Sequence, residues 1–198
     1  MEKPAESEGS DEPAYSYKPS LMGAAWMFRL TPSHLAWTKG YQSGQVPYRD
    51  IASIRMSFRP VTMQARRYLT EIWAPGTPKL IISSASWKSM VEQQSLAAPY
   101  SELVLQLHRA VAAAGGQPQC ASGMHPLLYW PGLLIYVAVL LGLAGLIVRA
   151  LQVSSYPGAL FVVAFMGFFA WQLGYFFKLN KPARYSVEAP PQDMLPRA

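Results

Sequence analysis

The C-terminal third of the chain contains two long apolar stretches, Leu127–Val148 and Pro157–Phe177. The first has 22 residues and no charged side chain, and the second has 21 residues in which Gln172 is the only strongly polar side chain. A helix needs about 20 apolar residues to cross a hydrocarbon core about 30 Å thick. The pattern therefore predicts a transmembrane helical hairpin over 127–178, with helices at 127–148 and 157–178.

Before the hairpin, apolar and polar residues alternate over short runs. Ile54, Met56 and Phe58 fall on one face of such a run, and Arg55 and Ser57 fall on the other, which is typical of a half-buried strand. Similar runs bounded by Pro and Gly predict strands at 26–30, 35–38, 68–73 and 79–83, with turns at 42–45 and 48–51. The polar segment 84–96 is ambiguous, and a helical turn near Trp87 is one interpretation.

One amphipathic helix is predicted at the end of this region. Leu103, Leu107 and Ala110 repeat at helical spacing, Pro99 falls in the first turn, and two glycines at 115–116 end the pattern. The expected organisation is a disordered acidic tail (1–22), a folded domain (23–116), a linker (117–126), the hairpin (127–178) and a cytoplasmic C-terminal tail (179–198). The N-terminal tail is expected to be disordered because Glu, Ser and Pro dominate it, and such a composition buries too little apolar surface.

Several stretches resemble the bacterial pleckstrin-homology-like (bPH) domains of membrane proteins. They are FRLTPSHLAWTKG (Phe28–Gly40), VPYRDIASIR (Val46–Arg55) and the KLIISS segment before the helix. The resemblance covers about residues 24–115 and implies an α+β fold, in which a curved antiparallel β-sheet or partial barrel is capped by one C-terminal helix. Many bPH proteins place their membrane helices before the domain, whereas here they follow it. The family carries no catalytic residues, so the resemblance assigns none.

The net charge of +6 is unevenly distributed. Residues 1–19 carry two lysines against five acidic residues, residues 20–126 carry ten Lys and Arg against four acidic residues, and residues 127–198 carry five against two. Basic residues flank both ends of the hairpin, and the connector between its helices holds only Arg149. By the positive-inside rule, we expect a multi-pass protein with both termini in the cytoplasm. The resemblance to bPH proteins implies that the membrane is the bacterial inner membrane.

The candidate functional residues in this sequence are basic residues and helix-packing residues. The single cysteine, Cys120, and the three histidines form no metal-ligand spacing, and nucleotide-binding and nucleophile motifs do not occur. We therefore expect no enzyme, cofactor or metal. The candidate lipid-contact residues are Arg55, Arg59, Arg66 and Arg67, for which a solvated strand face is the alternative. The candidate helix-packing residues, chosen for small size or for an intramembrane amide, are Ala138, Gly142, Ala170, Gln172 and Gly174.

These features favour a membrane-anchored, non-enzymatic adaptor. Its bPH-like domain would bind a protein partner or an anionic lipid surface on the cytoplasmic side. The alternative is a small accessory subunit of a membrane transport or pore complex, assembled through the hairpin. The expected partners are membrane lipids and a protein or membrane complex, and not nucleic acid. The small-residue faces are also compatible with a homo-oligomer.

Overall fold

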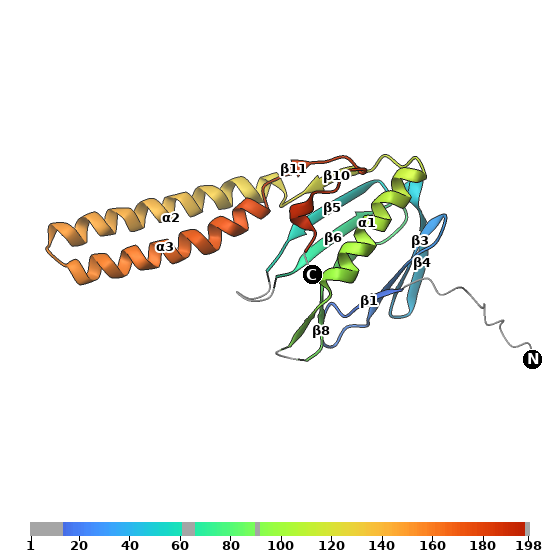
Figure 1. The fold of residues 1–198 in the computed structure, drawn as a ribbon, viewed down its shortest axis with the longest axis horizontal. Helices are drawn as coiled ribbons and strands as arrows, with labels where there is room; N and C mark the ends of the chain where they lie inside the picture. The colour runs from blue at the N-terminus through green and yellow to red at the C-terminus, as the bar shows by residue number, and fades with distance from the viewer. Residues whose placement is uncertain (1–13, 61–65, 90–91, 197–198) are drawn as a thin grey trace, which may run out of the picture.

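The computed structural model describes residues 14–60, 66–89 and 92–196 and shows an α+β fold with several antiparallel sheets and three α-helices. A sheet domain occupies one end of the molecule, and two long helices extend from it as an arm (Figure 1).

The first sheet is antiparallel and has the order β1-β2-β3-β4. Its strands are β1 (Tyr15–Tyr17), β2 (Trp26–Leu30), β3 (His34–Lys39) and β4 (Gln42–Pro47). The predicted turn at 42–45 was wrong, because these residues pair along their whole length with β3. Gly44 allows this pairing, since a Cβ atom there would lie 2.8 Å from the ring of Trp37.

β1 also corrects the expected N-terminal tail. Tyr15 and Tyr17 are buried, and they pair with Phe28 and Trp26 of β2. Two tyrosine rings bury enough apolar surface to order this short segment. The prediction of a disordered tail is therefore wrong for β1, and residues 18–22 connect β1 to the rest of the domain. Residues 1–13 of the predicted tail lie outside the described residues.

The second sheet has the order β11-β10-β5-β6-β7. Antiparallel strands β5 (Ser53–Phe58), β6 (Tyr68–Trp73) and β7 (Leu80–Ser83) confirm the predicted runs, while β10 (Gln119–Ser122) and β11 (Ala183–Arg184) were not predicted. β10 pairs in parallel with β5, and β11 pairs antiparallel with β10. The expected linker and C-terminal tail therefore both contribute strands to the sheet.

The ambiguous segment after β7 forms a small hairpin of β8 (Ala85–Trp87) and β9 (Gln93–Ser95), so the helical turn considered near Trp87 is wrong. Short 3-10 turns η1 (Tyr48–Asp50) and η2 (Gln192–Met194) complete the domain.

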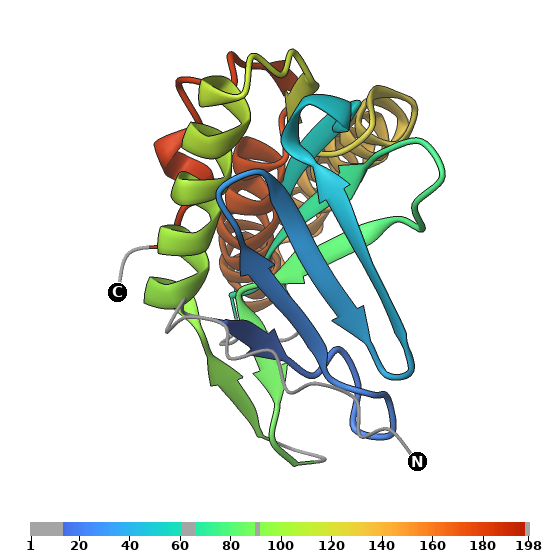
Figure 2. The same cartoon turned by 90° about the vertical axis from the view of Figure 1, so that its right-hand side faces the viewer.

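The predicted amphipathic helix is α1 (Ala97–Ala113). Its apolar face, with Leu103, Val104 and Leu107, lies in the core together with inward side chains of both sheets. The hydroxyls of Tyr100 and Thr70 lie 2.7 Å apart and join α1 to β6 inside this core. Figure 2 shows α1 running along one side of the two sheets, with the long helices behind them.

The two apolar helices are α2 (Pro126–Gln152) and α3 (Tyr156–Leu179), and each is long and apolar enough to cross a membrane. They pack antiparallel along their length, and Tyr136 of α2 donates a hydrogen bond of 3.0 Å to the carbonyl of Ala170 on α3. This pair confirms the two predicted apolar helices and is consistent with transmembrane segments.

Candidate functional site

Both ends of the helical arm are attached to the same strand, β5. Before α2, the Gly123 amide donates to the Met56 carbonyl at 2.8 Å. After α3, the buried side chain of Asn180 donates to the Phe58 carbonyl at 2.8 Å and accepts from the Phe58 amide at 3.2 Å. The Met124 amide joins the two ends by donating to the Asn180 carbonyl at 3.0 Å.

This attachment depends on glycine at position 123. Its φ is 80°, and a Cβ atom there would lie 2.4 Å from the Lys181 carbonyl oxygen. Only glycine fits such a conformation and such a close approach. The arm is therefore fixed to the sheet by backbone and amide hydrogen bonds, and the expected ten-residue linker does not exist as a free tether.

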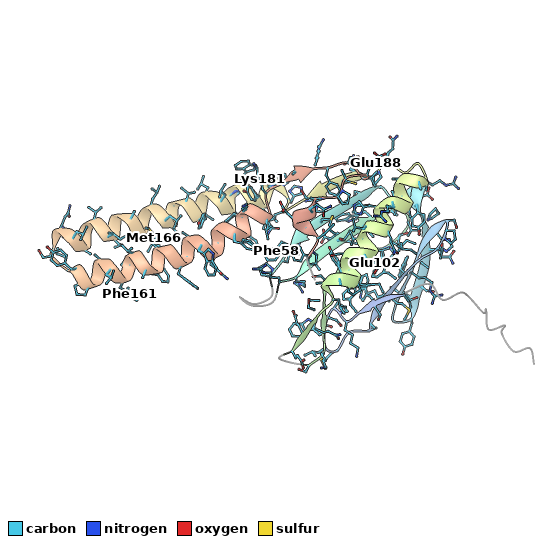
Figure 3. The ribbon with its side chains drawn as sticks, in the orientation of Figure 1. Phe58, Glu102, Phe161, Met166, Lys181 and Glu188 are labelled. Atoms are coloured by element: carbon cyan, nitrogen blue, oxygen red, sulfur yellow. The ribbon has the colours of Figure 1, made fainter. Side chains whose placement is uncertain are left out.

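A large open cavity, here called the basal cavity, lies beside this attachment. Its volume is about 1260 Å³, and it lies among the C-terminal end of α3, the β8–β9 hairpin and the chain around η2. Figure 3 shows Phe58 and Lys181 where the arm meets the domain. The charged residues that line the basal cavity are Arg66, Lys178, Lys181, Glu92 and Asp193.

Aromatic contacts hold Arg66 at the arm side of the basal cavity. Its guanidinium lies 5.3 Å from the ring centroid of Tyr175, and Tyr175 meets Phe58 edge to face at 6.0 Å. A cation over an aromatic face is attracted by the ring quadrupole, so Tyr175 orients the Arg66 charge toward the end of α3.

Tyr68 lies in the same lining as a neutral hydroxyl. Its pKa is raised mainly by burial and further by nearby Tyr175, while Arg66 opposes the shift. The phenol therefore remains protonated near neutral pH, and the cavity combines a neutral hydroxyl with cations. This set of groups is suited to holding an anion such as a phosphate.

The structure separates the four candidate arginines into three places. Arg55 and Arg59 lie on the outer face of the second sheet, where Arg55 is directly opposite Glu71 of β6. The Glu71 carboxylate is buried, with an ion pair of 2.7 Å to Lys79 and a longer one of 3.8 Å to Arg59. The charge of this face is therefore partly neutralised within the protein.

Arg66 and Arg67 line different cavities although they are neighbours in sequence. Arg66 lines the basal cavity, and Arg67 lines a smaller cavity together with Tyr17 and Trp26. Successive side chains of an extended chain point to opposite faces, which explains the division.

The helix-packing candidates divide as well. Ala170 and Gly174 face α2, where Tyr136 bonds the Ala170 carbonyl and its hydroxyl would lie 3.5 Å from a Cβ atom on Gly174. Ala138 and Gly142 are exposed on α2. The hydrogen bond between the helices comes from Tyr136, and Gln172 makes none within the part of the chain that the structure describes.

Sequence reasoning did not single out Tyr175, Lys178, Lys181 or Asn180 as site residues. The two lysines were visible only as the positive flank of the second apolar stretch. Their place in the same cavity lining as Arg66, more than one hundred positions earlier, is a tertiary property that no local pattern carries.

Among the described residues, no group of three His, Cys, Asp or Glu side chains is placed to hold a metal ion. Comparison with protein-family models, curated proteins and solved structures finds no match.

Proposed function

We propose that this protein is a membrane-anchored, non-enzymatic adaptor. In this proposal α2 and α3 cross the bacterial inner membrane, and the sheet domain binds a protein partner or the anionic lipid surface on the cytoplasmic side. The observation that supports it best is the attachment of both ends of the arm to β5, because this holds the basal cavity at the level where the apolar helices end.

The bPH-like identity of the domain is part of the proposal. Its support is the order of elements: a four-stranded antiparallel sheet, then the antiparallel strands β5, β6 and β7, then α1 packed into the core. The β8–β9 hairpin and the parallel strand β10 are additions to that order.

Lipid contact at the basal cavity follows from where the charges lie. The ring of Tyr175 holds Arg66 next to α3. Lys178 belongs to the end of α3, and Lys181 follows just after it. The acidic lining residues, Glu92 and Asp193, come from the domain side. Basic residues next to a membrane helix are attracted to anionic lipid by about 1 kcal/mol each. The cavity would therefore take a lipid phosphate from the arm side.

Native mass spectrometry of the full chain from nanodiscs of mixed phosphatidylglycerol and phosphatidylcholine tests this role. We expect the wild type to retain phosphatidylglycerol preferentially, and Arg66→Gln with Lys178→Gln to lose most of that preference. The matched control is Arg49→Gln with Arg109→Gln, which removes the same charge from η1 and from α1, elements that contact each other away from the arm. An equal loss in both double variants, or no preference in the wild type, would contradict the proposal.

The exposed face of α2 supports a second candidate, an accessory subunit of a membrane transport or pore complex. Ala138 lines an apolar groove on α2 with Ile135 and Leu141, and α3 does not cover it. We expect Ala138→Cys to form intermolecular disulfides in membranes if the hairpin assembles with copies of itself. Ala170→Cys, which faces Tyr136, is the matched control, and a monomeric Ala138→Cys protein would argue against self-assembly through this groove.

A further inference from the structure

A second cavity of about 430 Å³ lies at the end of the first sheet next to the β8–β9 hairpin. It shares Ala85, Trp87 and Gln93 with the basal cavity, and its other lining residues do not line the basal cavity. These include Tyr17 of β1, Trp26 of β2, Lys39 of β3 and Arg67, which precedes β6. The two cavities can therefore be altered separately.

Strand pairing fixes the walls of the second cavity. Trp26 is paired with both Tyr17 and Lys39, and Trp87 is paired with Gln93. Backbone and hydroxyl hydrogen bonds at Lys18 join the two walls, since its carbonyl accepts from the Trp87 amide at 3.1 Å and its amide donates to Ser86 Oγ at 3.0 Å. The cavity is thus built from ordered elements on both sides.

Two buried polar atoms in this lining have no hydrogen-bond partner among the described residues. They are Nε of Arg67 and Oε1 of Gln93. A buried polar group without a partner destabilises a protein, the more so when it is charged, so native proteins seldom leave one unsatisfied. Gln93 lines both cavities, whereas Arg67 lines only the second one, so the unpaired Nε of Arg67 in particular indicates a ligand here.

The rest of the lining defines what kind of ligand fits. Tyr17, Trp26 and Trp87 provide aromatic walls, and Lys39 adds a second cation, with its Nζ 4.8 Å from the Trp26 ring centroid. Burial lowers the pKa of the Arg67 guanidinium, and nearby Arg59 adds to the shift. A negative charge beside Arg67 would relieve both effects, while the walls require an apolar body.

We propose that the second cavity binds a small amphiphilic anion, a carboxylate or phosphate monoester on a short apolar body. The anionic group contacts Arg67, Lys39 adds a second positive charge to the lining, and the apolar body lies against Trp26 and Trp87. Gln93 bonds the anionic group, because its amide donates after a 180° rotation of the side chain. A cavity of this size lies in the usual range of about 300–1,000 Å³ for small-molecule sites. This inference does not depend on the lipid role of the basal cavity.

Titration of the full chain in phosphatidylcholine nanodiscs tests the inference, with tryptophan fluorescence and calorimetry as readouts. Hexanoate and hexyl phosphate are the probes, and hexan-1-ol and inorganic phosphate each lack one half of the expected ligand. We expect saturable binding of both anionic probes with a Kd on the order of 1 mM, as suits ligands of this size. We expect the alcohol and inorganic phosphate to bind at least tenfold more weakly.

Neighbouring arginines provide the matched variants. Arg67→Gln is expected to weaken hexanoate binding about tenfold, because it removes the principal cation. Arg66→Gln, which alters only the basal cavity, is expected to leave binding unchanged. If Arg67→Gln lowers the melting temperature strongly, the milder variants Lys39→Gln and Trp26→Phe replace it, and each is expected to weaken binding severalfold.

Three results would overturn the inference. They are the lack of saturable binding of either anionic probe, hexan-1-ol binding as tightly as hexanoate, and equal weakening by Arg66→Gln and Arg67→Gln. Loss of phosphatidylglycerol retention in the basal-cavity variants leaves these measurements unaffected, so the two proposals fail separately.

Discussion

At the scale of single residues, His108 shows how burial assigns a role that spacing leaves open. Its Nδ1 lies 2.7 Å from the Val104 carbonyl, which can only accept, so Nδ1 carries the hydrogen. Its Nε2 lies 3.1 Å from the Tyr185 hydroxyl and accepts from it. The neutral ring thus satisfies both nitrogens inside the core and joins α1 to the segment after α3.

This arrangement predicts a pH-dependent stability. Burial lowers the pKa of His108 from its ordinary value of 6.5, so the unfolded chain binds a proton that the folded protein does not. Stability that is present above pH 6.5 is therefore lost as the pH falls below that value, by at most about 1.4 kcal/mol per pH unit.

Thermal unfolding of the full chain between pH 7.5 and about pH 5 measures this effect. We expect the melting temperature to fall with pH in the wild type and to fall less steeply in His108→Gln. Equal slopes in the two proteins would show that His108 does not contribute.

At the scale of elements, the segment after α3 is part of the domain. Met194 and Leu195 around η2 are buried in the core, and Ser101 of α1 donates a hydrogen bond of 2.9 Å to the Pro196 carbonyl. This segment closes over the core next to α1, on the same side of the molecule as the basal cavity that it helps to line.

Shortening these side chains is expected to destabilise the whole domain. Replacement of a buried Met or Leu by Ala typically costs about 2–5 kcal/mol, so Met194→Ala and Leu195→Ala should each lower the melting temperature markedly. Gln192→Ala, an exposed position of the same turn, should change stability by less than about 0.5 kcal/mol. Similar melting temperatures for all three variants would mean that the segment is not part of the cooperative core.

At the scale of the whole molecule, the arm and the domain form one connected body. Both ends of the arm attach to β5, and β11 pairs with β10 immediately after α3. The domain and the C-terminal segment must therefore lie on the same side of any membrane that α2 and α3 cross, and the tip of the arm, at Val153–Ser155, must lie on the other.

Cysteine labelling tests this topology. In intact bacterial cells, we expect a membrane-impermeant maleimide to label Ser154→Cys and to label Gln192→Cys only after permeabilisation, because the basic flanks predict a cytoplasmic domain. The native Cys120 is buried and is an internal control that should react only after unfolding. Labelling of Gln192→Cys in intact cells would reverse the predicted orientation.

The local pattern of the sequence was sufficient for the elements whose own residues carry the apolar signal. Period-two alternation indicated β5, helical spacing indicated α1, and two long uncharged runs indicated α2 and α3. The first two signals can be recognised because burial of one face constrains residues that are close in sequence. The third can be recognised because a helix that crosses a membrane needs about 20 consecutive apolar residues.

Tertiary structure alone decided the polar elements and both cavities. β4, β10 and β11 have little apolar pattern, and they are strands because a neighbouring strand supplies their hydrogen bonds. Tertiary structure also decided the place of Asn180, whose side-chain amide bonds the end of a strand 122 positions earlier. It likewise placed the neighbours Arg66 and Arg67 in the linings of two different cavities. The sequence by itself determined that two apolar helices follow an α+β domain. The tertiary structure decided how the helices and the domain are joined, because the hydrogen bonds and ring contacts at the junction form between residues that no local pattern relates.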